Sequence, residues 1–439
     1  VLLLAFHSMS LGVNVVNHSI PSWYQTELLD VFEKFLDDKL KVYQRHGLNE
    51  GWISKAMSLG ACVDCNPAEA TWNTHFKIVS GTVYSAGGIP KFWNDHHRKR
   101  VKSVFAILAE IVKIDPNLPD VEFVVNFHDY NKIMRRESLI WGDSSYTRPF
   151  SRTENENRTE YLSFNDHLQD YFGMDWELYY KVYGNHFGNP AYSDDDVDHA
   201  IFSATSCAFS YDVSFPTTFY DFAGLDAEWG ALEAAASSLP WHRRAATAYF
   251  RGSCWYYRDH GRTRAWVMSR VAPDLVDAAW YDEIRTDMLE QDGVPQFGDI
   301  AAAARYRFVL HLEGHDFWSM RVRWLARLGS LLLRQQLPCE EFYDGAFSPF
   351  RHYLPLARDL SDLYDAVLWA RERDHEARGM ARALQARARV AVTQTAVLHY
   401  VHRLLTRFAR LLRYRVQVGP ADVPVDPASR CLDSLLACS

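Results

Sequence analysis

The sequence has no apolar run that approaches the roughly 20 residues needed to span a bilayer, which predicts no membrane span in the chain. It is also short of basic charge, with a net charge of −8 and a pI near 6.1. Nucleic-acid-binding domains are usually basic, so this charge argues against nucleic acid as the main partner. The remaining composition, 48% hydrophobic and 14% aromatic over 439 residues, is that of a globular protein long enough for two domains.

Cysteine is scarce, and its pattern argues against a metal site. The seven cysteines stand at positions 62, 65, 207, 254, 339, 431 and 438. Their odd number leaves at least one thiol unpaired within the chain. Cys62 and Cys65 have the spacing of half a zinc site, but no second Cys/His pair at metal spacing accompanies them. We interpret this pair as a disulfide or as plain thiols, and predict no bound metal.

Neither end of the chain carries a complete targeting signal. The sequence opens on the apolar run Val1–Phe6 without an initiator methionine, which is compatible with the end of a signal or anchor segment in a trimmed or partial chain. No KDEL-like retention signal closes it. Two glycosylation acceptor patterns, Asn17-His-Ser and Asn157-Arg-Thr, fit a lumenal protein.

The stretch from Tyr306 to Leu333 reads as a strand, a tight turn at Gly314 and a helix that begins near Ser319. This order directs backbone N–H groups and a partial positive charge toward a phosphate. Arg321 and Arg323 fall in the predicted first helical turn, where cations oppose the helix dipole unless an anion joins them. We therefore expect a phosphate here. The alternative is an ordinary strand–helix unit with solvated arginines.

A second strand–turn unit occurs at Ala248–Phe250, where Arg251-Gly-Ser253 follows at once. Three arginines stand just beyond it, at positions 258, 262 and 264. Arginine binds phosphate oxygens in bidentate fashion and stays charged. Two such units in one chain favour a diphosphate, and hence a nucleotide, over a purely structural interpretation.

An acidic residue follows a third predicted strand. Residues 121–127 are mostly apolar and are followed by His128 and Asp129. Ligands of open α/β sheets collect at the carboxyl ends of the strands, so Asp129 is a candidate catalytic residue. The alternative is that Asp129 caps the next segment.

The rest of the chain is mainly helical or polar. We predict helices in residues 20–50, 103–114 and 224–239, and consecutive helices from 363 to 414 whose arginines are solvated. The tail after Val418 is expected to be loosely ordered. The acid run Asp194–Asp198 has the composition of a cation-and-nucleotide site, but a solvated loop is the favoured interpretation.

Several blocks, taken in order, resemble the Rumi-type protein O-glucosyltransferases and the related fungal capsule xylosyltransferases of glycosyltransferase family 90. The blocks are NLPDVEFVVNFHDY (117–130), FSYDVSFP (209–216), LPWHRRAATAYFRGS (239–253), RYRFVLHLEG (305–314), SMRVRWLARLGSLLL (319–333) and EEFYDGAFSPFRHYLPLARDLSDL (340–363). They span most of the region from 115 to 415. The combination is specific, although no single block would be.

The resemblance implies an α/β fold of GT-B type, with two Rossmann-like domains facing a central cleft and a helical C-terminal end. The N-terminal domain (1–225) would carry the catalytic acid on the acceptor side, the C-terminal domain (226–418) would bind the UDP-sugar, and 419–439 would be the tail. Asp129 would be the catalytic base. Donor contacts carry over to Ser253, Ser319, Arg321 and either Arg258 or Arg262.

The resemblance also implies an inverting transfer of glucose or xylose from a UDP-sugar to a hydroxyl of a protein or glycan acceptor, without an obligatory cofactor, in the lumen of the endoplasmic reticulum or Golgi. The alternative is a catalytically silent member that binds glycans or nucleotides. This chain departs from the Rumi-type branch between Gly314 and Ser319, where His-Asp-Phe-Trp is longer and bulkier. Residues 151–200 have no clear counterpart in that branch.

Overall fold

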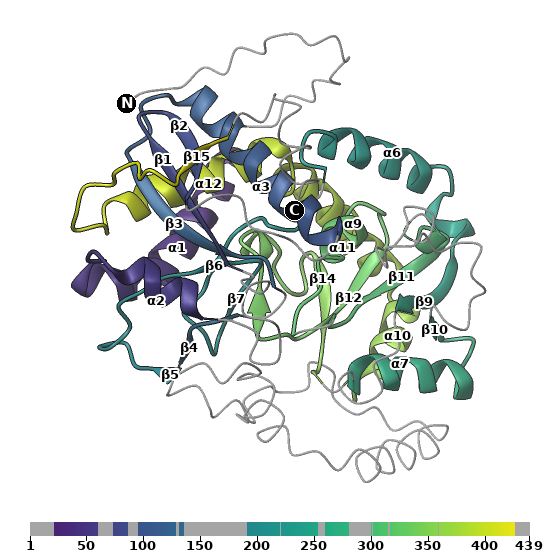
Figure 1. Cartoon of the computed structure of the whole chain (residues 1–439). Coiled ribbons are helices and arrows are strands. Elements are labelled where there is room, and N and C mark those ends of the chain that lie inside the picture. Colours follow the sequence, from purple (N-terminus) through teal and green to yellow (C-terminus); the bar gives the residue numbers. More distant parts are fainter. Residues whose placement is uncertain are drawn as a thin grey trace.

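The computed structural model describes residues 22–59, 73–86, 95–128, 131–135, 191–219, 221–252, 260–280, 300, 302–314, 317–358 and 360–425. Cys62, Cys65, Asn17 and Asn157 lie outside these residues. The described part is an α/β fold with two larger sheets, each covered by helices (Figure 1). Within the described part, no helix is long and apolar enough to cross a membrane.

The first sheet has six strands in the order β15-β2-β1-β3-β6-β8. Its strands are β1 (Asn73–Val79), β2 (Thr82–Ser85), β3 (Val121–Asn126), β6 (Phe202–Ser203), β8 (Val213–Ser214) and β15 (Val423–Pro424). β1 pairs antiparallel with β2 and β3, whereas β3, β6 and β8 run parallel. Ser80 and Gly81 both have positive φ, as a two-residue hairpin turn requires. Every residue of β3 is buried, which explains its near-continuous apolar sequence.

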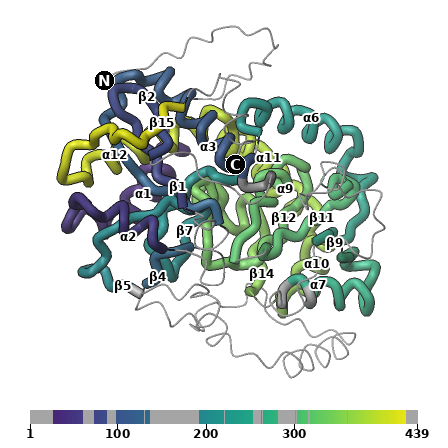
Figure 2. The backbone as a smooth tube through the Cα atoms, viewed as in Figure 1, coloured from purple at the N-terminus to yellow at the C-terminus, as the bar shows by residue number. Residues whose placement is uncertain are grey.

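Four helices pack around this first sheet, namely α1 (Ser22–His46), α2 (Trp52–Ser58), α3 (Asp95–Ile114) and α12 (Gln394–Ala409). The predicted helices at 20–50 and 103–114 are therefore confirmed, and α3 begins earlier than predicted. Aromatic rings fill the centre of this layer, and Phe123 stacks on both Phe76 and Phe202. α12 comes from the far end of the sequence and contacts α1, α3 and β3 (Figure 2).

The second sheet is parallel and has the strand order β10-β9-β11-β12-β14. Its strands are β9 (Ala245–Gly252), β10 (Val276–Trp280), β11 (Tyr306–His311), β12 (Leu331–Gln335) and β14 (Tyr353–Leu356). Numbered along the chain, this is the 2-1-3-4-5 order of one common doubly wound sheet. The predicted strands at 248–250 and 308–312 are confirmed, and the first is longer than predicted.

The side chains of the second sheet alternate between two apolar cores. Val309 and Leu332 belong to the large core that also contains the first sheet. Phe308, Leu310 and Leu331 belong to a separate core on the other face. The helices that supply these cores are α6 (Leu225–Ser237), α7 (His260–Val271), α10 (Leu363–Glu372) and α11 (Asp374–Ala391). The consecutive helices predicted from residue 363 onward are thus confirmed, since α10, α11 and α12 follow one another.

Shorter elements connect these layers. They are the parallel pair β4 (Met134–Arg135) and β5 (Ala191–Tyr192), the antiparallel pair β7 (Ser206–Cys207) and β13 (Cys339–Glu340), the one-turn helix α9 (Val322–Leu325), and the 3-10 turns η2 (Trp241–Arg243) and η4 (Asp344–Ala346). The β7–β13 pair joins the segment between β6 and β8 of the first sheet to the segment that follows β12.

The structure differs from the prediction after Ser319. The helix there is only α9, and Leu331–Leu333, which continued the apolar pattern, belong to strand β12. Gly329, with φ +63°, reverses the backbone between them. A short apolar run is compatible with either a buried strand or a buried helix. Here Leu331–Leu333 form a strand, which pairs with β11 on one side and β14 on the other.

The structure also differs at the tail. Val423–Pro424 pair with β2, and residues 426–439 lie outside the described part. Tyr414 leads into this tail and donates its hydroxyl to Glu122 of β3 at 2.5 Å, while Trp52 donates to the same hydroxyl at 2.7 Å. α12 and β15, from the last part of the described chain, join the first sheet.

Candidate functional site

The second sheet changes winding direction between β9 and β11. β10 lies on one side of β9, and β11, β12 and β14 follow on the other. In doubly wound sheets the ligand binds at the carboxyl ends of the two strands that flank this point. Here those ends carry Arg251-Gly252 on β9, His311 on β11 and Leu312-Glu313 directly after β11. This edge is therefore where a doubly wound sheet would bind the predicted diphosphate.

Arg262 reaches this edge from the first turn of α7. Its Nε donates to the backbone carbonyl of Glu313 at 2.6 Å, and the residue is 7% exposed. The Glu313 N–H in turn donates to the Gln335 side-chain oxygen at 2.8 Å. Arg262, one of two arginines that the sequence left open, thus lies at the carboxyl end of β11. Arg258 and Ser253 lie outside the described residues.

Arg321 reaches the same edge from the other side. Its guanidinium donates to the Arg251 carbonyl on β9 and lies 5.6 Å from the centroid of the Phe250 ring. Arg251 itself pairs with Asp277 of β10 at 2.8 Å and stacks on Tyr249. Arg251 is therefore fixed by β10, whereas Arg321 bridges from the turn after β11 to the end of β9.

The turn that carries Ser319 is closed by two backbone contacts. The Gly314 N–H donates to the Trp318 carbonyl at 2.7 Å, and a Cβ at position 314 would lie 2.5 Å from that oxygen, so only glycine fits. His311 Nε2 donates to the Ser319 carbonyl at 2.9 Å. Burial, together with the charge of Arg334, lowers the pKa of His311 to about 3, so its ring is neutral and acts only as a hydrogen-bond donor here.

Arg323 does not have the role that the sequence suggested. It is 2% exposed, donates to the Thr218 carbonyl at 2.6 Å, and stacks between Phe219 and Trp324. Its placement is thus explained by buried contacts rather than by an anion. α9 is also only one turn long, so the predicted helix-dipole contribution is lost as well. Ser319 and Arg321 remain as the candidates from this stretch.

The candidate base, Asp129, lies outside the described residues, but the structure describes both sides of it. On one side, the His128 N–H donates to the Asn126 side chain at 2.9 Å. On the other, the buried Asp212 carboxylate accepts the N–H groups of Lys132 at 2.9 Å and Ile133 at 2.7 Å. Burial raises the pKa of Asp212 to about 6 despite these donors.

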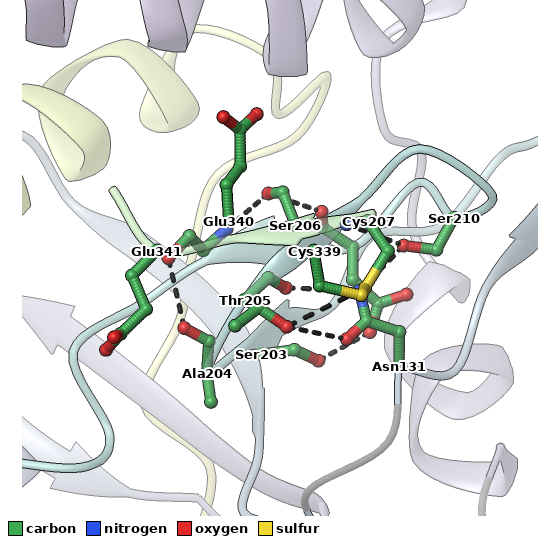
Figure 3. Close-up of a disulfide and its surroundings, with 12 residues drawn as sticks. Asn131, Ser203, Ala204, Thr205, Ser206, Cys207, Ser210, Cys339, Glu340 and Glu341 are labelled. Carbon is green, nitrogen blue, oxygen red and sulfur yellow. Dashed lines mark hydrogen bonds between the residues drawn. A yellow bond between two sulfur atoms is a disulfide. The ribbon is translucent and has the colours of Figure 1, made fainter. Parts of the chain in front are cut away.

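A buried apolar cluster brings the segment after Asp129 next to the turn that carries Ser319. Met134 of β4 shares this cluster with Phe317 and Trp318, which immediately precede Ser319. The cluster also contains Phe209 and the disulfide between Cys207 of β7 and Cys339 of β13 (Figure 3). The structure therefore brings together the surroundings of two candidates, Asp129 and Ser319, that are far apart in sequence.

The acid run is occupied by partners within the chain. Asp194 accepts the Tyr211 hydroxyl at 2.8 Å, Asp195 pairs with Arg45 at 2.8 Å, and Asp198 binds Lys55 and His199. The fourth acid, Asp196, accepts the Ser193 N–H. Within the described residues no group of three or more His, Cys, Asp or Glu side chains is placed to hold a metal ion. These contacts favour the loop interpretation of the run.

A second buried acid, Glu341, lies beside Arg323 in the segment after β13. It is 3% exposed, accepts the Tyr343 hydroxyl, and has the Thr218 hydroxyl at 3.5 Å. Burial raises the pKa of Glu341 to about 7, although the nearby Arg323 charge opposes that shift. Sequence reasoning missed Glu341, Asp212 and His311. The available signal was a charged or titratable residue within an otherwise apolar or aromatic run.

Arg323 is buried and Arg321 is partly exposed, so we predict that replacing them lowers stability by different amounts. Arg323→Met leaves the Thr218 carbonyl and Glu341 buried without their cation, so we expect the free energy of unfolding to fall by about 3 kcal/mol. Arg321→Met removes one hydrogen bond at a partly exposed position and should cost about 1 kcal/mol. Urea denaturation measures both. Equal losses would contradict the structural role assigned to Arg323.

The raised pKa of Glu341 predicts a pH dependence of stability. Because its pKa is higher in the fold than the ordinary 4.5, its contribution is fully present below about pH 4.5 and is lost as the pH rises through about 7. Glu341→Gln should therefore reduce the loss of unfolding free energy between pH 5 and pH 8, by on the order of 2 kcal/mol. The control is Glu340→Gln, whose side chain is 41% exposed. An unchanged slope in Glu341→Gln would contradict the prediction.

The chain is similar in sequence to several known proteins. Protein O-glucosyltransferase 3 of Mus musculus is 29% identical over 175 residues, which is 38% of this chain and 33% of that protein. Protein O-glucosyltransferase 1 of Homo sapiens is 27% identical over 188 residues, 42% of this chain and 47% of that protein. Uncharacterized protein 035R of Invertebrate iridescent virus 3 is 30% identical over 199 residues, 42% of this chain and 18% of that protein. Each match covers less than half of the relative.

The family model described as Glycosyl transferase family 90 matches residues 192–434, more than half of the chain. This range contains the whole second sheet, with Arg262, Ser319 and Arg321 at its carboxyl edge, and also Asp212 and both cysteines of the disulfide. The chain belongs to glycosyl transferase family 90.

Proposed function

We propose that this protein is an inverting glycosyltransferase that transfers glucose or xylose from a UDP-sugar to a hydroxyl of a protein or glycan acceptor. The observation that carries the proposal is the convergence at one edge of the second sheet: Arg262 and Arg321 meet the ends of β11 and β9, and the cluster under Ser319 also holds the segment after Asp129. Family membership and the likeness to proteins named as O-glucosyltransferases support the same class of reaction.

In this proposal the UDP diphosphate lies over the ends of β9 and β11. Arg321 is held at the end of β9 and Arg262 at the end of β11, and Ser319 lies on the turn that precedes Arg321. Guanidinium groups stay charged and offer paired donors, so they suit the negative charge that grows on the β-phosphate as the sugar leaves. Ser253 is the further donor contact that the family motif supplies. The two sheets would then be the cores of a GT-B arrangement.

Asp129 is the proposed general base. The acceptor oxygen attacks the anomeric carbon from the face opposite UDP while the bond to the β-phosphate oxygen breaks, and the proton of the acceptor hydroxyl passes to the Asp129 carboxylate. The hydroxyl has too high a pKa to ionise alone at neutral pH, so a positioned carboxylate lowers the barrier. Two cations close to the diphosphate make an obligatory metal unnecessary in this scheme, and we propose none.

The proposed location is the lumen of the endoplasmic reticulum or Golgi. The buried disulfide between Cys207 and Cys339 supports this, because disulfides form and persist in oxidising compartments and are rare in the cytosol. The carboxylates of the acid run Asp194–Asp198 are paired with other side chains of the chain, which supports a structural loop at these residues rather than a metal-dependent donor site.

A donor-binding prediction concerns Arg321. Arg321→Met removes a charge-assisted contact to phosphate worth about 1.5–3 kcal/mol, so the Kd for UDP should rise roughly 10- to 100-fold. Isothermal titration with UDP measures this. Arg305→Met is the matched control, because Arg305 stands at the opposite end of β11, just before Tyr306. A UDP affinity that survives Arg321→Met would remove Arg321 from the donor site.

A catalytic prediction concerns Asp129. Asp129→Asn should lower the transfer rate by about 10²–10⁴-fold and leave the Kd for UDP within about threefold of wild type. The control is Asp120→Asn at the other end of β3, where the carboxylate accepts the Ser80 N–H at 2.7 Å. The assay is UDP release from a panel of UDP-sugars, with and without EDTA. Full activity in Asp129→Asn would rule out the base assignment, and UDP binding without release from any donor would favour the silent alternative.

A further inference from the structure

The disulfide between Cys207 and Cys339 lies between the two halves of the proposed site, and this position suggests a role beyond stability. Cys207 is on the segment that follows β6, and Cys339 is on the segment that follows β12, 132 residues later. Their strands pair directly, with Cys207 opposite Cys339 and Ser206 opposite Glu340. Both cysteines are almost fully buried, so the bond is part of the core of this junction.

On one side, the disulfide is tied to the segment after Asp129. The Asn131 amide donates to the Ser210 hydroxyl at 2.6 Å and to the Thr205 carbonyl at 3.1 Å (Figure 3). Ser210 also accepts the Cys207 N–H at 3.4 Å. Two backbone bonds complete the attachment, from Arg135 N–H to the Phe209 carbonyl at 2.9 Å and from Tyr211 N–H to the Ile133 carbonyl at 2.8 Å. The 205–211 segment thus holds residues 131–135 along their length.

On the other side, the disulfide supports the turn that carries Ser319. Phe317 and Trp318 pack in the same buried cluster as Cys207 and Cys339, and the ring of Phe317 meets the edge of Phe209 at 5.6 Å between centroids. Phe317 and Trp318 belong to the bulky stretch that distinguishes this chain from the Rumi-type branch. Within the second sheet the turn has its own contacts, from His311 to Ser319 and from Arg321 to Arg251.

We infer that the Cys207–Cys339 disulfide and its apolar cluster are a positioning device, which sets the distance between the segment after Asp129 and the turn of Ser319. The inference rests on the proposed function. Of the proposed donor contacts, the two arginines have anchors outside the cluster, because Arg262 is held by the carbonyl of Glu313 and Arg321 by that of Arg251, whereas Ser319 directly follows Trp318 of the cluster. Loss of the disulfide therefore separates the two effects: catalysis falls while the donor still binds.

The test compares Cys207→Ala/Cys339→Ala with wild type at a temperature where both are folded. Because a misplacement of about 1 Å costs up to roughly 10²-fold in rate, we expect kcat to fall by about tenfold or more, with the Kd for UDP within about twofold of wild type. Hydrogen exchange should rise in residues 131–135 and 317–320 and stay unchanged in α12. Phe317→Leu keeps the disulfide but disturbs the same cluster, so it should also lower kcat and raise hydrogen exchange in residues 131–135 and 317–320. It replaces the double variant if the double variant does not fold.

Val367→Ala is the control for stability alone. Val367 is fully buried in the separate core of α10, so this variant should lower stability without changing kcat at the assay temperature. A double variant whose kcat matches that of Val367→Ala, or whose exchange in the two segments is unchanged, would overturn the inference. A wild-type protein that transfers sugar from no donor would instead reject the proposed function, and the exchange measurement would still decide the role of the disulfide.

Discussion

The parallel pairing of β9 with β11 is the constraint on which the candidate site depends. Because β10 and the remaining strands extend from this pair in opposite directions, the helices and turns that follow β9 and β11 leave the sheet on opposite faces. α7 brings Arg262 to the end of β11, and the turn after β11 brings Arg321 back to the end of β9. Arg262 is held by a backbone carbonyl of the connection after β11, and Arg321 is held by a carbonyl at the end of β9. Two cations are thereby held at one edge of the sheet.

The junction between the two sheets is unusual in its buried charge. Arg323, Glu341, Asp212 and Arg327 are each less than 5% exposed, and every one of them has hydrogen-bond partners from a segment distant in sequence. Buried ion pairs add little net stability, because desolvation offsets most of the Coulomb attraction. Buried charges instead restrict the geometry of the fold. A buried charge that loses its hydrogen-bond partners destabilises the protein, so an arrangement that supplies all of these partners is favoured over the others. The same logic applies to the disulfide at this junction, which excludes other pairings of β7 and β13.

Local pattern was sufficient for much of the fold but not for the parts decided by distant neighbours. The long helices α1, α3 and α11, the buried strand β3 and the strand β11 follow from periodicity, because each carries a complete apolar face or run. Local pattern did not predict two strands. Leu331–Leu333 pair with β11 and β14, and Val423–Pro424 pair with β2, so in both cases the partner strand lies far away in sequence. The arginines show the same limit. Sequence spacing treats Arg321 and Arg323 alike, and only the position of Thr218 and Phe219 shows that Arg323 is a core residue.

Resemblance and structure inform different parts of the site. The family motifs gave Ser319 and Arg321 and left Arg258 and Arg262 open. Geometry explains why these candidates are so widely spaced in sequence: strands β9 and β11 are neighbours in the sheet although α7 and β10 lie between them in the chain. In the described residues, the segment after Asp129 meets the turn of Ser319 in the cluster that contains Met134, Phe317, Trp318 and the disulfide, none of which belongs to a catalytic motif. A reaction that needs a base on one sheet and a diphosphate on the other requires a fixed distance between them, and the apolar junction adds a covalent link to the large core that the two sheets already share. The apolar junction is therefore as much a part of the proposed catalyst as the charged edge that it supports.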